Sequence, residues 1–290
     1  MTQPVNGAPV RRRKKVKGWQ RVLFHWRFPV IIVLILMLLS LLLGRALPKK
    51  ATDTAANQAA SSSQQDAASS AKTKTQNAAF DDAVVDALQA DDNEIQKLVC
   101  LTAEDGNVTY NTDTDRVLLA FWSSAPDAFT KDKQTTLDSD TYAYADLELA
   151  AWGKAHSDDL KNGKTDRLCQ LFGLPANGGG STFVTAWVTP ERIYRPAYQP
   201  DAQIGTMTTA FEENVDADFT AFFDTQIEQN YFTTPRPWTR LGYTYDWGTT
   251  DKNHYGVTEF VIPSGTKITV KDIFTNDETI TKLRKGSMGA

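Results

Sequence analysis

Hydrophobic and polar positions divide the chain into three parts. An uninterrupted apolar run of 17 residues extends from Phe28 to Gly44. Residues 48–79 then contain mainly Ala, Ser, Gln and Thr, with no aromatic or large aliphatic side chain. From Phe80 onward, apolar residues recur at the spacings of helices and strands, and the roughly 210 residues of this part are enough to bury one hydrophobic core.

The third part alternates segments of helical and of strand character, so we expect an α+β fold. Helices are predicted in Asp81–Leu101 (two short ones, broken near Asp91 and Asp92), Leu147–Leu160, Thr165–Phe172 and Asp216–Phe232. Strands are predicted at Arg116–Trp122, Thr141–Tyr144, Thr182–Thr189, Thr239–Trp247, Gly256–Ile262 and Thr266–Ile273. We expect a mostly antiparallel sheet with helices packed on one face, and an antiparallel meander of the last three strands.

The apolar run predicts a transmembrane helix over residues 28–47. Its uncharged stretch covers about 25 Å, slightly less than the hydrocarbon core, and Arg27 and Arg45 can extend their guanidinium groups to the headgroups. A cleaved secretory signal is the alternative. It would need a small-residue cleavage site, which the segment Arg45–Lys50 does not provide.

Charge predicts the orientation of this helix. Residues 1–27 contain eight Lys and Arg residues and no acid, which is typical of a cytoplasmic tail in contact with anionic lipid. Residues 80–290 are therefore expected to form an extracytoplasmic domain. The tail could also be an arm that binds nucleic acid, but its place beside a membrane segment argues against nucleic acid as a partner.

Residues 48–79 predict a disordered stalk, because their composition cannot bury a core. Such a coil would have a root-mean-square reach on the order of 30 Å. A partly helical Ala-rich stretch is the alternative. The first 50 residues hold 11 of the 31 Lys and Arg and none of the 35 Asp and Glu, so the remainder has a net charge of −15. This acidic part would repel anionic polymers and accept cations or basic partners.

Catalytic and metal-binding motifs are mostly absent from the sequence. The histidines His25, His156 and His254 lack the spacing of metal ligands, and the chain contains no nucleophile elbow, phosphate-binding loop or dinucleotide fingerprint. We expect no metal and no cofactor. Cys100 and Cys169 both follow the apolar run, where oxidising conditions would allow a disulfide, and two separate buried thiols are equally compatible with their surroundings.

The strongest candidate site is the segment Pro237–Gly248 together with Glu259. Arg240, Asp246 and Glu259 are charges within predicted strands, and two carboxylates beside aromatic rings are what a glycosidase uses. The rings that could contact a ligand are Trp238, Tyr243, Tyr245 and Trp247. Alternatively the tyrosines belong to the core, and Arg240 forms a structural ion pair with Asp246 or Glu259.

Four segments together resemble an uncharacterised group of bacterial hypothetical proteins, membrane-anchored or secreted. They are RLCQLFGLP (Arg167–Pro175), FVTAWVTPERIYRPA (Phe183–Ala197), PWTRLGYTYDWG (Pro237–Gly248) and YGVTEFVIP (Tyr255–Pro263). The segment PWTRLGYTYDWG is the most specific of them. The chain departs from the group at Ala197, where a cysteine is often found. The resemblance implies a domain type and no activity.

Three functions remain open on the sequence alone. The favoured one is a non-catalytic binding or interaction module, held at the bacterial cell surface by a single-pass anchor, with a protein or a cell-wall glycan as partner. The second is a cell-wall glycan hydrolase that uses Asp246 and Glu259 as its paired carboxylates. The third is a structural subunit of an envelope complex.

Overall fold

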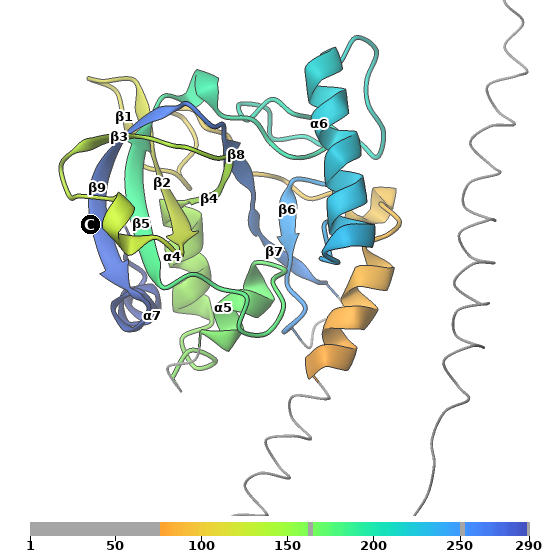
Figure 1. Ribbon diagram of the computed structural model, residues 1–290, viewed down its shortest axis with the longest axis horizontal. Helices are drawn as coiled ribbons and strands as arrows, with labels where there is room; N and C mark the ends of the chain where they lie inside the picture. Colours follow the sequence, from red (N-terminus) through yellow and green to blue (C-terminus); the bar gives the residue numbers. More distant parts are fainter. Residues whose placement is uncertain (1–75, 162–164, 250–252, 289–290) are drawn as a thin grey trace, which may run out of the picture. The chain divides into compact units, whose positions relative to one another are not determined.

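The computed structural model describes residues 76–161, 165–249 and 253–288, which form an α+β domain (Figure 1). The predicted tail (1–27), transmembrane helix (28–47) and residues 48–75 of the predicted stalk lie outside the described residues. Within the described part of the chain, no helix is both long enough and apolar enough to cross a bilayer.

A seven-stranded sheet forms the centre of the domain. Every strand pair in it is antiparallel, so the prediction of a mostly antiparallel sheet is confirmed. The order of strands is β3-β9-β5-β2-β4-β8, and β1 pairs with the start of β2. The strands are β1 (Tyr110–Asn111), β2 (Arg116–Ser123), β3 (Gln134–Thr136), β4 (Thr141–Ala145), β5 (Thr182–Val188), β8 (Phe260–Ile262) and β9 (Lys267–Thr275). A second, two-stranded sheet pairs β6 (Tyr243–Tyr245) with β7 (Tyr255–Thr258).

Strand β5 lies between β2 and β9, and six of its seven residues are buried. Apolar side chains on both of its alternating faces are the reason, because such a strand can be covered on two sides. This confirms the predicted central strand at Thr182–Thr189.

Two hydrophobic clusters cover the two faces of the main sheet. Leu119 and Phe121 of β2 belong to one cluster, and Ala120 between them belongs to the other, as the alternation of side chains along a strand requires. The first cluster is completed by loop residues such as Val99 and Ile193. The second contains residues of three helices, and each fully buried Leu in it contributes roughly 1.5–3 kcal/mol to stability.

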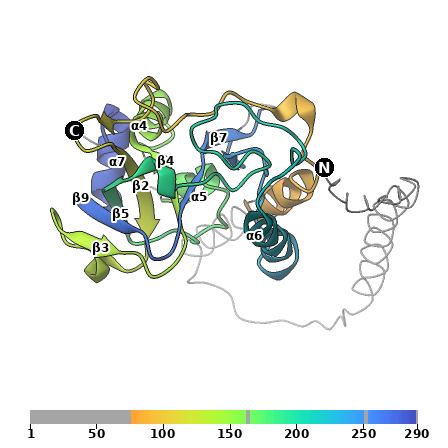
Figure 2. The same cartoon turned by 90° about the horizontal axis from the view of Figure 1, so that it is seen from above.

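The helices gather in two places (Figures 1 and 2). The second cluster contains residues of α4 (Asp146–Ala155), α5 (Asp166–Leu171) and α7 (Asn276–Lys285). In both views α6 (Ala217–Glu228) lies far from α7, and it continues as the π-helix η4 (Gln229–Thr233). Three short 3-10 turns are η1 (Asp92–Glu94), η2 (Pro126–Ala128) and η3 (Pro190–Arg192).

The start of the domain differs from the prediction. Residues 76–86 form a helix, so the last four residues of the predicted disordered stalk are helical. The second helix expected in Asp81–Leu101 is only the 3-10 turn η1. Asp91 begins this turn by accepting a hydrogen bond from the Asn93 N–H at 2.8 Å, and the chain is irregular after it.

The predicted strand Thr239–Trp247 is wrong over its first half. Arg240 and Gly242 both adopt positive φ, at 59° and 83°, so the chain turns there and only Tyr243–Tyr245 extends as β6. The meander is also wrong, because β9 pairs with β5 and β3 rather than with β8. Helix α7 was not predicted, although Thr275 and Glu278 form a capping box and Gly286 ends the helix in the left-handed conformation.

Candidate functional site

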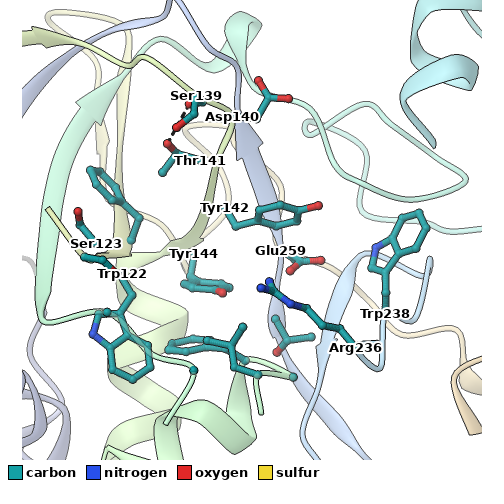
Figure 3. Close-up of a pocket in the computed structure, with 18 of the residues that line it drawn as sticks. Trp122, Ser123, Ser139, Asp140, Thr141, Tyr142, Tyr144, Arg236, Trp238 and Glu259 are labelled. Atoms are coloured by element: carbon teal, nitrogen blue, oxygen red, sulfur yellow. Dashed lines mark hydrogen bonds between the residues drawn. The ribbon is translucent and has the colours of Figure 1, made fainter. Parts of the chain in front are cut away.

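A cavity of about 430 Å³ opens between the main sheet and the segment that leads into β6 (Figure 3). Strands β2 and β4 form one wall. Arg236, Trp238 and the side chains of β6 form the opposite wall, and Glu259 lies between the two. The cavity therefore joins residues that lie more than 130 positions apart in the chain.

Glu259 occupies the point where the chain passes from the small sheet to the main sheet. It is the single residue between β7 and β8, and its N–H donates to the Gly242 carbonyl at 3.0 Å. The last pair of the β4–β8 ladder joins Ala143 to Phe260, so the same register continued by one residue puts Glu259 opposite Tyr144. Because side chains alternate along a strand, Glu259 shares the cavity face with the tyrosines of β4 while Phe260 enters the core.

The carboxyl group of Glu259 faces the cavity without a partner in the described part of the protein. Glu259 is only 9% exposed, and its carboxyl oxygens make no hydrogen bond or ion pair with any described residue. Burial raises the pKa of Glu259 to about 8, and the positive charge of Arg236 opposes this rise only in part. A carboxyl in this condition is ready to accept a hydrogen bond or to give up a proton to a group that enters the cavity.

Aromatic rings form the wall on the β4 side. Tyr144 stacks on Phe172 with ring centroids 4.2 Å apart, and its hydroxyl has no hydrogen-bond partner among the described residues. Tyr142 donates its hydroxyl to Gln226 Oε1 at 2.9 Å. Burial and the nearby Glu259 raise the pKa of both tyrosines, so both hydroxyls stay protonated at neutral pH.

Trp238 and Arg236 form the opposite side of the cavity. Trp238 is held by α6, because its ring lies 4.8 Å from that of Phe223, and its Nε1–H donates to the Pro196 carbonyl at 3.1 Å. Arg236 is exposed, and its side chain has no hydrogen bond or ion pair with a described residue. Its guanidinium points toward Glu259 in Figure 3, but the two charged groups stay beyond the 4.0 Å of an ion pair. An acidic and a basic side chain thus face one space without contact.

Asp246, the second predicted carboxylate, lies elsewhere. Its two oxygens accept bonds from Arg167 Nη1 at 2.8 Å and Nη2 at 2.7 Å, and Oδ1 also accepts the Gly248 N–H at 3.0 Å. Asp246 lines a second cavity of about 430 Å³ rather than the one that contains Glu259. The structure therefore does not bring together Asp246 and Glu259.

Arg240 forms neither of the ion pairs expected from the sequence. Its Nη2 donates to the Ala87 carbonyl at 3.0 Å and its Nη1 to the Tyr198 hydroxyl at 3.3 Å. The guanidinium also lies 5.3 Å from the centroid of the Tyr231 ring. This arginine holds the end of helix 76–86 against the turn before β6 and faces no ligand space.

The four predicted contact rings divide between the two cavities. Trp238 and Tyr243 line the cavity around Glu259, Trp247 lines the second cavity, and Tyr245 borders both. The polar ends of all four are already bonded. Trp238 donates to the Pro196 carbonyl, Tyr243 to the Glu94 carbonyl at 3.0 Å, Tyr245 to Asp86 at 2.8 Å and Trp247 to the Leu174 carbonyl at 2.9 Å.

The two cysteines are both free thiols, so the possible Cys100–Cys169 disulfide is not formed. Cys169 is buried in α5, and Cys100 lies beside Gly205. Burial raises the pKa of both thiols, and at Cys100 the neighbouring Asp105 adds to the rise. A thiol with a raised pKa is a poor nucleophile at neutral pH.

One group of possible metal ligands was not foreseen in the sequence. Asp86, Glu94 and His254 place one ligand atom each within 4.8 Å of the others. Asp86 approaches Nδ1 of the imidazole and Glu94 approaches Nε2, each at 3.6 Å, and burial raises the pKa of Glu94. The carboxylates thus approach opposite nitrogens of one ring, whereas the ligands of one metal ion converge on a single point.

Sequence reasoning missed three residues of the cavity: Tyr142, Tyr144 and Arg236. The two tyrosines alternate in TYAYA, a pattern that places both on one face of a strand, and this signal was available. No local sequence pattern marks Arg236 as a cavity residue, because only the long-range packing of its segment brings it near Glu259.

Comparison of the chain with family models, curated proteins and solved structures gave no match. The resemblance to the group of bacterial hypothetical proteins therefore stays a prediction. Any functional argument has to come from the cavity itself.

Proposed function

We propose that this chain is a membrane-anchored binding module of the bacterial cell surface, and that the cavity around Glu259 receives its ligand. The unpartnered carboxyl of Glu259 carries the proposal. This carboxyl is largely withdrawn from solvent, faces the cavity and has no hydrogen-bond partner among the described residues, so it suits a site that is completed by a ligand. The aromatic rings of Tyr142, Tyr144 and Trp238 offer flat surfaces on which that ligand can pack.

The cell-surface location is supported by the 17-residue apolar run and the eight basic residues before it. In this arrangement residues 80–290 lie outside the membrane. The stalk gives them the reach to meet a ligand, which can be a protein or a cell-wall glycan. Added protease should remove this part from intact cells. Recovery of the intact chain from the soluble fraction of broken cells would contradict the location.

A glycan hydrolase that uses Asp246 and Glu259 finds no support in the geometry. Such enzymes place two carboxyl groups on either side of one bond, about 5–10 Å apart. Asp246 instead lines a different cavity and is bound by Arg167. Binding without reaction therefore fits the cavity better than hydrolysis.

The test compares Glu259→Gln with Glu191→Gln, an exposed control outside the cavity. If the carboxyl serves a ligand, Glu259→Gln is at least as stable as the unchanged protein at neutral pH, but it no longer binds. Binding is measured as a rise in the midpoint of thermal unfolding with soluble peptidoglycan fragments, neutral sugars and amino acids. Loss of stability in Glu259→Gln would assign the carboxyl a structural role and contradict the proposal.

A further inference from the structure

The cavity offers an acidic and a basic side chain, Glu259 and Arg236, that the described part of the protein leaves unpaired. Glu259 is 9% exposed and lacks any partner among the described residues, and Arg236 lacks one as well. The carboxyl and the guanidinium face the same space, yet they do not come within the 4.0 Å of an ion pair (Figure 3). A ligand that enters between them can contact both.

The positions of the two groups suggest which end of the ligand each one meets. Glu259 lies between the walls of the cavity, where an ammonium group would give it the hydrogen-bond donors that it lacks. Arg236 lies on the exposed side, where its planar guanidinium can hold a carboxylate through two parallel bonds. In an α-amino acid these two groups flank a single carbon atom, so one small molecule meets both requirements.

The aromatic wall supports the same assignment. Tyr142, Tyr144 and Trp238 border the cavity beside Glu259, and electron-rich ring faces attract cations. The unpartnered hydroxyl of Tyr144 adds a group that can bond to the ligand. A neutral sugar could also pack on these rings, but it would leave the charge of Arg236 without a counterpart.

We infer that the cavity binds a zwitterion, namely a free α-amino acid or an α-amino acid unit with both charges free. On binding, the Glu259 carboxyl releases its proton to the solvent and pairs with the ammonium group. The ligand carboxylate pairs with Arg236, and the ligand side chain lies along the aromatic wall. This inference rests on the proposed binding function and names the chemistry of its ligand.

The experiment uses the purified full chain in detergent and the common amino acids, one at a time, as probes. For the strongest binder, calorimetry then compares three forms: the free amino acid, its N-acetyl derivative without the cation, and its amide without the anion. The free form should bind on the order of 10- to 100-fold more tightly than either derivative, because each derivative loses one charged hydrogen-bonding pair.

Matched variants assign each charge to its residue. Glu259→Gln should weaken binding of the free amino acid on the order of 10-fold or more and leave the weak binding of the N-acetyl derivative unchanged. Arg236→Gln should weaken binding of the free amino acid to a similar extent and leave the weak binding of the amide unchanged. Glu191→Gln should change neither. Equal losses for all three forms in either cavity variant would overturn the assignment.

N-acetylglucosamine is included as a neutral ligand, so that failure of the inference can be told from failure of the binding function. If this sugar binds in a manner that depends on Glu259 and no amino acid binds, the cavity is a ligand site of different chemistry. The amino-acid inference then fails, and the proposed binding function stands. If neither the amino acids nor the sugar bind, both proposals fail.

Discussion

Arg167 and Asp246 form a buried, bidentate ion pair, with Nη1–Oδ1 at 2.8 Å and Nη2–Oδ2 at 2.7 Å. Their side chains are only 9% and 3% exposed. The pair joins α5 to the end of β6, and the guanidinium also lies 4.9 Å from the centre of the Trp152 ring. Asp246 is therefore a structural residue.

Breaking this pair from one side should be costly. Asp246→Asn leaves the buried charge of Arg167 with only the exposed Asp159, 4.0 Å from its Nε, as a counter-ion among the described residues, so we expect the free energy of unfolding to fall by about 3–5 kcal/mol. Urea denaturation at neutral pH measures the loss. The double variant Arg167→Met, Asp246→Leu should recover much of the loss, because it removes both buried charges together. A single variant as stable as the unchanged protein would contradict the structural role.

Glu259 should make stability depend on pH. Because the folded protein holds a proton on Glu259 up to about pH 8 and the unfolded chain only up to the ordinary value of 4.5, the folded state binds more protons between these limits. Stability should fall as pH rises through this window, by at most about 1.4 kcal/mol per pH unit from this group. Arg236, Tyr142 and Tyr144 also face the carboxyl, and burial raises the pKa of both tyrosines, so the tyrosines keep their protons in this range.

The variant Glu259→Gln isolates this contribution. It removes the titrating group, so its advantage in stability over the unchanged protein should grow from pH 5 to pH 8. Thermal unfolding of both proteins in the same buffers at several pH values measures the difference. Parallel pH profiles of the two proteins would show that the folded state does not hold the proton.

Gly242 should tolerate no side chain. Its φ is +83°, and a Cβ added there would lie 2.4 Å from Arg195 Cδ and 2.7 Å from Leu98 Cδ1. Arg195 cannot move aside readily, because it is fully buried and donates hydrogen bonds to four backbone carbonyls. We expect Gly242→Ala to lower the free energy of unfolding by about 2 kcal/mol or more.

A second glycine provides the control for this substitution. A Cβ at Gly106 would meet nothing within 4 Å, and its φ is not positive. Gly106→Ala should therefore change stability by less than about 0.5 kcal/mol. Chemical denaturation of the two variants side by side makes the comparison, and equal effects would mean that the turn before β6 is not as close to Arg195 as described.

Reductant should have no effect on folding, since Cys100 and Cys169 are separate thiols. A chromogenic thiol reagent should detect both in the denatured, unreduced protein. In the native protein the reaction should be slow, because burial raises the pKa of both groups. Absence of free thiol after denaturation without reductant would instead reveal a disulfide.

Elements with a strong local pattern could be predicted from the sequence. The continuous apolar run of β5, the short helix α5 with Gly173 in the left-handed conformation after it, and the stripe of α6 all appear where they were expected. Each depends on interactions between residues a few positions apart. Helix α7 had equally local signals at Thr275, Glu278 and Gly286, and they were overlooked.

Elements that depend on distant contacts could not be predicted. The segment Thr239–Gly242 has the composition of a strand, but it turns because Arg240 and Gly242 take positive φ where the chain closes over Arg195. Strand β9 leaves the expected meander because it pairs with β5, about 85 residues earlier, through an extended ladder. Neither partner is visible in the local pattern.

The candidate site likewise combines features that the local sequence determines with features that distant contacts decide. From the sequence alone, Asp246 and Glu259 were two equivalent carboxylates in neighbouring strands, each with aromatic residues nearby. The tertiary structure gave Asp246 a partner in Arg167, 79 positions away, and placed Glu259 at the change of sheet, facing a cavity without a partner. Local residue types determine the regular elements, because their hydrogen bonds and apolar faces repeat over a few residues. Only the packing of distant segments decides which buried charge is neutralised, because that depends on which side chains arrive within a few ångströms.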